Sequence, residues 1–233
     1  MDLSFNETQT MLQTTTTEFM EAELPKSRVL EIDESPSGFA PDLWEKMSGA
    51  GWAGMLIPEE YGGSDNSFMD VGVLHEVMGY HACSSPHLSS AVLCAHAILE
   101  AGTESQKRNL LPGIASGQRI FAFAFTEPEY GWGAGGVQMQ ATRRGENFII
   151  NGTKLFVPDA NVADQLLVVA RTSLGQTTEQ GVTLFAVDKS APGISVRVLS
   201  GWIGPKMCEV NVDNVEVPVS GVLGAVDEAW PVI

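Results

Sequence analysis

Residues 121–136 read FAFAFTEPEYGWGAGG, and the chain changes its pattern at this stretch. Phe and Ala alternate over its first five residues, which is the period-two pattern of a β-strand with bulky side chains on one face and small ones on the other. Thr126-Glu127-Pro128 ends the alternation, and a glycine-rich loop follows. Such a loop lets backbone amides approach a ligand closely, because glycine tolerates positive φ and has no side chain. The spacing fits neither a phosphate P-loop nor a dinucleotide fingerprint, so the loop alone identifies no ligand.

The residues before this stretch show the periodicity of helices. Apolar residues recur at helical spacing, and Ser4 with Glu7 and Thr103 with Gln106 have the spacing of capping boxes. Gly49, Gly102 and Gly117 suit helix ends. We expect no strand in this part of the chain. We expect five helices, at about residues 5–24, 41–49, 67–78, 86–102 and 103–117. Residues 1–117 are therefore predicted to form an all-α domain.

The residues after residue 118 show the periodicity of strands. Seven segments alternate in polarity and are separated by turn signals, with no helical pattern between them; these are residues 121–126, 137–143, 148–157, 165–171, 182–187, 194–199 and 208–217. Short connections without helices indicate an antiparallel β-sandwich or β-barrel, not a parallel α/β sheet. The prediction is an α+β multidomain chain whose β domain spans residues 118–233. A further helical domain is expected to begin near residues 226–233.

Composition excludes several classes of function. The 233 residues include 29 acidic and 13 basic ones, for a formal net charge of −16, which disfavours binding to nucleic acid or to an anionic membrane. The chain shows neither a secretory leader nor an apolar run long enough to span a membrane, which predicts a cytoplasmic protein without membrane insertion. Three cysteines without C-x-x-C spacing and four histidines without i,i+4 pairs indicate neither a disulfide framework nor a metal site.

Several short strings, in order along the chain, resemble landmarks of the acyl-CoA dehydrogenase family. They are GWAG at 51–54, IPEEYGG at 57–63, FTEP at 125–128, NGTK at 151–154 and VDNV at 212–215. Any one string could arise by chance, but the ordered set covers almost the whole chain. The resemblance implies a bound FAD on the β domain and an acyl-CoA thioester held between the helical and β domains.

The family motifs also imply which residues form the site. Phe123, Phe125 and Thr126 would line the flavin, with Thr126 hydrogen-bonding the ring, and Phe156, Val157 and Pro158 would face another part of it. Phe121 is better explained as β-core. The loop residues Glu127, Gly131 and Trp132 would lie at the substrate. The resemblance assigns no catalytic residue to this chain, because the glutamate base of the family lies in a C-terminal helical domain.

Flavin chemistry explains why the family needs these parts. Removing hydride from an unactivated carbon requires an acceptor that no side chain supplies. The α-proton needs a carboxylate base in a dry pocket, and the thioester carbonyl needs hydrogen bonds as enolate charge forms. The implied function is α,β-dehydrogenation of an acyl-CoA thioester, in acyl-CoA metabolism, by a chain that cannot complete the reaction alone. Electron-transfer flavoprotein could be its electron acceptor.

The sequence departs from the family pattern in the glycine-rich loop and after Val157. Trp132 stands where the family has a small hydroxyl residue that helps hold a phosphate-bearing ligand, and Glu129 adds an unfavourable negative charge near such a ligand. Pro158 replaces a hydroxyl residue near the flavin and offers neither a hydroxyl nor an N–H. Two alternatives therefore remain: a degenerate, non-catalytic partner subunit of a heteromeric acyl-CoA dehydrogenase, and a flavin-dependent oxidase or monooxygenase. In each case we expect a homo- or hetero-oligomer with an acyl-CoA dehydrogenase homologue.

Overall fold

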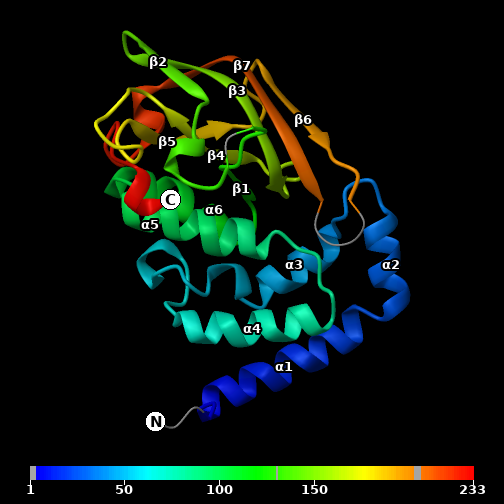
Figure 1. Cartoon of the computed structure of the whole chain (residues 1–233). Coiled ribbons are helices and arrows are strands. Elements are labelled where there is room, and N and C mark those ends of the chain that lie inside the picture. The colour runs from blue at the N-terminus through cyan, green and yellow to red at the C-terminus, as the bar shows by residue number, and fades with distance from the viewer. Residues whose placement is uncertain (1–3, 130, 202–205) are drawn as a thin grey trace.

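The computed structural model describes residues 4–129, 131–201 and 206–233 and shows a helical layer beneath a β-sheet layer (Figure 1). The helical layer precedes the sheet in the sequence. Its helices are α1 (Glu7–Glu23), α2 (Lys26–Glu34), α3 (Pro41–Gly49), α4 (Phe68–Tyr80), the π-helix η3 (His87–Cys94), α5 (Ala95–Ala101) and α6 (Glu104–Ala115). Within the described residues, no helix is long and apolar enough to cross a membrane.

Helix α2 was not predicted, and the start of α1 was predicted at the wrong cap. Only Ile32 of α2 is buried, so its sequence carries no apolar stripe that would reveal a helix. At the start of α1 the cap is Asn6, which accepts a hydrogen bond from the Gln9 N–H at 2.8 Å. The capping box expected at Thr103 and Gln106 is confirmed.

The segment predicted as one helix over residues 86–102 is a π-helix that continues into α5. A π-helix places one extra residue in each turn, so it changes which side chains face the neighbouring layer. Here Ser90 accepts a hydrogen bond from the Phe121 N–H at 3.0 Å. The π-helix therefore contacts the first strand directly.

The β layer is a mostly antiparallel, sandwich-like sheet, which confirms the predicted fold class. Its strands are β1 (Phe121–Ala124), β2 (Gln140–Arg144), β3 (Asn147–Pro158), β4 (Gln165–Arg171), β5 (Val182–Asp188), β6 (Ile194–Val198), β7 (Met207–Pro218) and β8 (Val222–Leu223). The strand order is β6-β7-β3-β2-β4-β5-β8, and β1 pairs with β4. This β1–β4 pairing is parallel, a local exception to the predicted antiparallel pattern.

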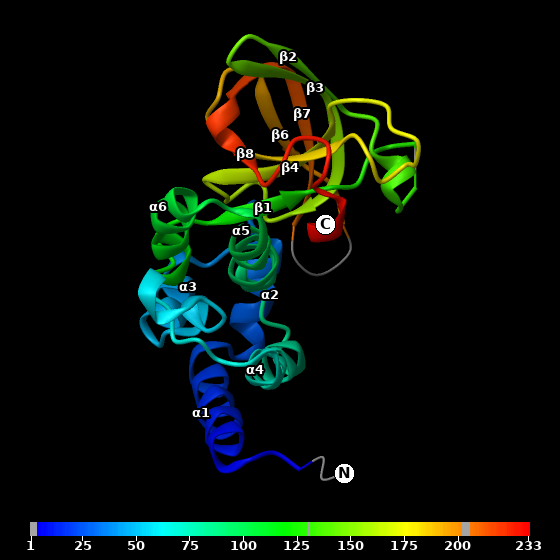
Figure 2. The same ribbon diagram turned by 90° about the vertical axis from the view of Figure 1, so that its left-hand side faces the viewer.

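One hydrophobic cluster crosses the boundary between the two layers. It includes Ile98 of α5 and Leu111 of α6 together with Phe121 of β1 and Leu166 of β4, all fully buried. Helices α5 and α6 lie on the side of the helical layer nearest the sheet (Figure 2). A second cluster lies inside the helical layer and includes Met20 of α1. The layers are therefore joined by shared apolar packing.

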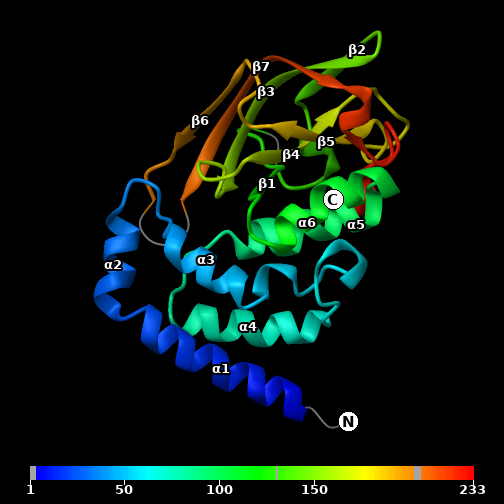
Figure 3. The ribbon, with the colours of Figure 1, turned by 180° about the vertical axis from the view of Figure 1, so that it is seen from behind.

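Polar side chains join the two layers at both ends of the boundary. Near α2, Asn161 Nδ2 donates to Ser37 O at 2.8 Å and Lys206 Nζ donates to Asp33 O at 2.6 Å. Figure 3 shows the chain after α2 close to the lower ends of β6 and β7. At the other end, Gln106 Nε2 donates to Val222 O at 2.7 Å. These bonds hold the sheet at a fixed position above the helices.

Candidate functional site

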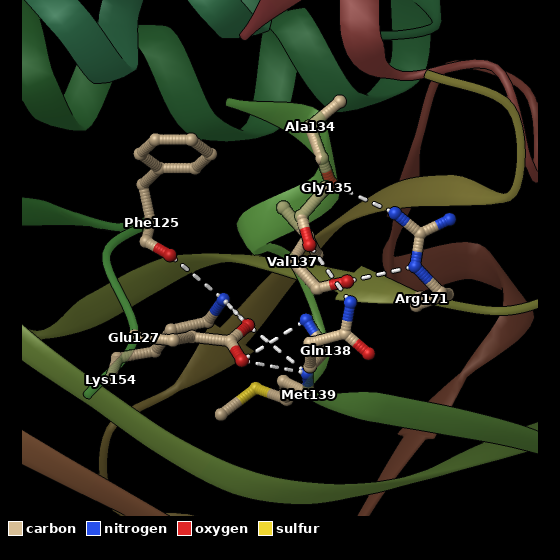
Figure 4. Close-up of polar contacts among 9 residues, drawn as sticks. All are labelled: Phe125, Glu127, Ala134, Gly135, Val137, Gln138, Met139, Lys154 and Arg171. Atoms are coloured by element: carbon tan, nitrogen blue, oxygen red, sulfur yellow. Dashed lines mark hydrogen bonds and ion pairs between the residues drawn. The ribbon is translucent and has the colours of Figure 1, made fainter. Parts of the chain in front are cut away.

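The chain that follows β1 is held against β3 through two consecutive backbone carbonyls. Lys154 Nζ donates to Phe125 O at 2.9 Å, and the Leu155 N–H donates to Thr126 O at 2.8 Å. Both carbonyls point toward β3. The Phe125 ring extends away from Lys154, toward the helical layer (Figure 4).

Glu127 and Lys154 form a buried ion pair under the glycine-rich loop. Lys154 Nζ lies 2.7 Å from Glu127 Oε1, and the two side chains are 0% and 4% exposed. The carboxylate also accepts from the N–H groups of Gln138 and Met139, each at 3.0 Å (Figure 4). Burial lowers the pKa of Lys154 to about 8, against the opposing effect of the Glu127 charge. Glu127 thus ties the two ends of the loop together.

Arg171 supports the same loop from β4. Its Nη2 donates to Ala134 O at 2.9 Å and its Nε donates to Val137 O at 2.8 Å (Figure 4). Backbone carbonyls fixed by a planar guanidinium keep one geometry, because the five N–H donors of arginine point in set directions. The loop is therefore preorganised by side chains on β3 and β4.

The predicted loop residues Gly131 and Trp132 lie at the outer surface of this loop. Gly131 has a φ of +80°, and an added Cβ would meet nothing within 4 Å. The Trp132 side chain is 81% exposed. The structure therefore brings Glu127 into the interior and leaves Gly131 and Trp132 facing solvent. Tyr130 lies outside the described residues.

The three phenylalanines of the opening stretch occupy different environments. Phe121 is fully buried and packs in the shared core, whereas Phe123 and Phe125 are half-buried. Thr126 is also half-buried. Phe123, Phe125 and Thr126 are thus partly accessible to a ligand, with two aromatic rings and one hydroxyl.

Phe156 is presented by an irregularity in β3. The register between β3 and β7 shifts between Lys154 and Val157, and Phe156 adopts a φ of +53°. A β-bulge redirects a side chain out of the regular alternation. The Phe156 side chain is 57% exposed, whereas Val157 is 1% exposed and belongs to the core. Pro158, half-buried, follows at the end of the strand.

Sequence reasoning did not identify three residues that shape this site. Lys154 lies in the quoted string NGTK, but nothing in the string shows that its ammonium reaches Phe125 and Glu127. Arg171 contacts Val137 and Ala134, which lie 34 and 37 positions earlier, and no local pattern reveals such contacts. Trp230 lies beside Phe125, with ring centroids 6.1 Å apart and an angle of 43° between the rings.

These residues fit a flavin ring in part. The rings of Phe123, Phe125 and Phe156 supply apolar surface, and a threonine hydroxyl such as that of Thr126 can hydrogen-bond a ring atom. The charge of Glu127 is compensated by Lys154, so it does not oppose an anionic ligand. Pro158 is the exception, because it has no N–H to donate.

Comparison with known proteins gives one consistent result. The family model "Acyl-CoA dehydrogenase, N-terminal domain" matches residues 6–118, and "Acyl-CoA dehydrogenase, middle domain" matches residues 122–215. The caffeyl-CoA reductase-Etf complex subunit CarC of Acetobacterium woodii is 31% identical, over 97% of this chain and 60% of its own length. The chain thus spans about 60% of the length of this curated relative.

Solved structures share the fold at similar coverage. The ChsE4-ChsE5 complex from Mycobacterium tuberculosis superposes with a TM-score of 0.86 at 26% identity, over 100% of this chain and 60% of the other. A glutaryl-CoA dehydrogenase from Mycobacterium smegmatis in complex with FADH2 gives a TM-score of 0.85 at 25% identity, over 97% of this chain and 58% of the other. With its two family-model matches and its fold, this chain belongs to the acyl-CoA dehydrogenase family.

Proposed function

We propose that this chain forms the flavin-binding part of an acyl-CoA dehydrogenase-type oxidoreductase. The observation that carries the proposal is the preorganised segment after β1, where half-buried Phe125 and Thr126 lie beside a loop fixed by Glu127, Lys154 and Arg171. A relative of similar fold is described in complex with FADH2. When bound, FAD would supply the hydride acceptor that no side chain provides.

The residues of this chain would bind and orient the flavin. Phe123 and Phe125 would exclude water from one side of the ring, and Phe156 would cover another part of it. The Thr126 hydroxyl would hydrogen-bond the ring. Because Phe125 O and Thr126 O are already bonded to β3, these side chains need little rearrangement on binding.

The acyl-CoA thioester is the proposed substrate class. Its binding would extend past Gly131 and Trp132, whose exposure leaves them free to meet a ligand. Trp132 offers an indole and no hydroxyl, so its contact would be with an apolar or ring-bearing part of the substrate. The proton-abstracting carboxylate would come from outside the 233 residues.

A second candidate function follows from Pro158. Without an N–H at this position the chain lacks one donor for a flavin, which favours a partner subunit that works with an intact homologue. A relative of similar fold is described as a ChsE4-ChsE5 complex, and another as a subunit of an Etf complex. A heteromeric assembly and an electron-transfer flavoprotein are accordingly the proposed partners.

Flavin content separates the two functions. The purified chain is passed through gel filtration after incubation with FAD, and bound flavin is measured by its absorbance. The flavin-binding function predicts close to one equivalent per chain. A colourless protein would overturn it, and flavin bound only after mixing with an intact homologue would establish the partner function.

Pro158→Thr provides a matched variant. Restoring an N–H and a hydroxyl should tighten FAD binding by roughly tenfold, the factor that about 1.4 kcal/mol gives. Unchanged affinity would mean that the flavin does not contact this position.

A further inference from the structure

Residues 225–233 follow strand β8 and bring Trp230 to the ring of Phe125. The two ring centroids lie 6.1 Å apart, and the ring planes make an angle of 43°. Aromatic rings attract one another at such separations, over a range of about 4.5–7 Å. Trp230 begins the short 3-10 helix η6 (Trp230–Val232), which contacts α5. A distant part of the chain therefore packs on a residue of the proposed flavin surface.

The bond that holds the backbone of Phe125 does not fix its ring. Phe125 O accepts from Lys154 Nζ at 2.9 Å, which holds the carbonyl but leaves several staggered positions of the side chain open. Phe125 and Trp230 are both half-buried. The indole offers a large, rigid apolar surface against which the ring can pack. Trp230 is thus placed to select one orientation of the Phe125 ring.

A closed cycle of hydrogen bonds holds the chain just before Trp230. The Asp227 N–H donates to Thr183 Oγ1 at 2.8 Å, and Thr172 Oγ1 donates to Asp227 Oδ1 at 2.6 Å. The two threonine oxygens lie 2.6 Å apart. Since Thr172 gives its one hydrogen to Asp227, Thr183 donates to Thr172 and completes the cycle. Thr183 is fully buried, which protects this part of the cycle from competing water.

Backbone bonds and apolar packing hold the rest of the segment. The Gly181 N–H donates to Asp227 O and the Ala229 N–H donates to Val182 O, each at 2.9 Å. Three residues on the two sides of Trp230 pack against the hydrophobic cluster shared by helices and sheet, namely Val226, Val232 and Ile233. Trp230 is therefore carried by a segment whose backbone is held at several points.

We propose that Trp230 is a positioning residue of the flavin site, which fixes the ring of Phe125, and that the hydrogen-bond cycle of Asp227 fixes Trp230 in turn. The inference rests on the proposed flavin site, because Phe125 is one of the rings that would line it. Trp230 lies outside the sequence strings that suggested this site, and its role requires no contact with the flavin. The affinity for FAD then depends on hydrogen bonds that join β4 and β5 to residues 225–233.

Trp230→Leu tests the contact between the two rings. Leucine keeps an apolar side chain against α5 but offers no aromatic face to Phe125. We expect the variant to bind FAD roughly threefold to tenfold more weakly than wild type, measured by isothermal titration. Trp230→Phe restores an aromatic ring and should recover most of this loss. Wild-type affinity in Trp230→Leu, or no recovery in Trp230→Phe, contradicts the proposal.

A double variant shows whether Trp230 acts through Phe125. FAD affinity is compared among wild type, Phe125→Leu, Trp230→Leu and Phe125→Leu/Trp230→Leu. If Trp230 only orients the Phe125 ring, its replacement has little effect once that ring is absent. The double variant should then bind FAD within about twofold of Phe125→Leu. Two losses that multiply would mean that Trp230 acts independently of Phe125, which rules out the positioning role.

Asp227→Gly tests the cycle that holds Trp230. Glycine adopts the observed φ of +70° without strain, and the change removes the carboxylate that accepts from Thr172 and, at 2.8 Å, from Ser173. Asp227 is not one of the residues placed at the flavin, so its effect on affinity must pass through Trp230. We expect weaker FAD binding, by no more than in Trp230→Leu, and no further loss when the two changes are combined.

Asn214→Gly is the matched control for Asp227→Gly. Asn214 of β7 also has a positive φ, +50°, and its Nδ2 donates to Asp213 Oδ1 at 2.7 Å. Its N–H donates to Asn151 Oδ1 at 2.8 Å, in a part of β3 away from Phe156. This variant should bind FAD as wild type does. Equal losses in the two glycine variants would mean that affinity follows general destabilisation, and would overturn the role of the cycle.

NMR of the Phe125 ring protons without FAD reports the contact itself. An indole packed beside the ring shifts these resonances, and both Trp230→Leu and Asp227→Gly should remove the shift. If Trp230→Leu does not fold, Asp227→Gly and its control provide the same comparison. Unchanged ring resonances in Asp227→Gly would show that the cycle does not position Trp230.

The two proposals fail in different ways. Absence of FAD binding by wild type would overturn the flavin site and with it the role of Trp230 there, while the ring resonances would still show the contact. FAD binding by wild type, with the same affinity in Trp230→Leu and Asp227→Gly, would overturn the positioning role alone.

Discussion

Lys154 and Glu127 show how a charge in a loop motif becomes part of the interior. In the sequence, Glu127 belongs to a string that borders a glycine-rich loop, which suggests a surface residue near a ligand. In the structure its carboxylate is enclosed by Lys154 and two backbone N–H groups. Removing one partner of such a pair leaves an uncompensated buried charge, which is far more destabilising than removing an exposed pair.

We predict that Lys154→Met destabilises the chain by about 3–5 kcal/mol, measured by urea unfolding. The double variant Glu127→Gln/Lys154→Met should lose less than the sum of the two single variants, because it leaves no unpaired charge. Lys46→Met is the control: Lys46 pairs with Glu23 while 49% exposed, so its loss should be under about 1 kcal/mol. Additive single effects would contradict this account of the pair.

The site could be predicted from sequence only where the signal is local. The resemblance could assign Phe123 and Phe125 to the flavin because the Thr-Glu-Pro string and the alternation before it lie in consecutive residues, and that role stays a prediction. The contacts of Lys154 and Arg171 could not be identified, since each side chain meets residues more than twenty positions away. Asp159 accepts a hydrogen bond from Ser89, which lies 70 positions earlier in the sequence, and no local pattern reveals this contact either.

Elements were predicted best where their pattern is regular and long. Strand β4 has the predicted bounds, residues 165–171, because its five central residues are all apolar and its two end residues are polar. Helix α2 was missed because it has little apolar surface, and His87–Cys94 was predicted as helix but not as a π-helix, since a π-helix has no distinct composition. The bulge at Phe156 also leaves no sequence signal, because a phenylalanine at positive φ is rare.

We predict that Phe156→Gly separates folding from flavin binding. Glycine adopts the observed φ of +53° without steric strain, so its stability should stay within about 1 kcal/mol of wild type. FAD affinity should fall by roughly threefold to tenfold, because an aromatic contact is worth about 0.5–1.5 kcal/mol. Isothermal titration and thermal unfolding measure the two effects.

Phe68→Ala is the control for this variant. Phe68 of α4 is 59% exposed, close to the 57% of Phe156, but it lies in the helical layer away from β3. Its removal should leave FAD affinity unchanged. Equal losses of affinity in both variants would mean that Phe156 acts through general destabilisation.

The helical layer and the sheet share one hydrophobic core, although the sequence pattern indicates two separate halves. A helical half and a strand half were predicted, and a boundary near residue 117 is still our proposal for the domain limit. The shared cluster of Ile98, Leu111, Phe121 and Leu166 could not be inferred, because periodicity shows which face of an element is buried but not what covers it.

We predict that helices and sheet unfold together because of this cluster. Leu111→Ala should lower stability by about 2–5 kcal/mol and shift a single transition, with calorimetric and van't Hoff enthalpies that agree. Two separate transitions in wild type, or a Leu111→Ala effect confined to helical amides, would show that the layers fold independently.

Amide hydrogen exchange with and without FAD tests most directly whether the surface formed by the end of β1 and the β3 bulge is the flavin site. We predict that FAD slows exchange in residues 121–126 and 154–157, while amides of α1 are unchanged. Protection confined to other segments, or no difference at saturating FAD, would contradict a flavin site at this surface.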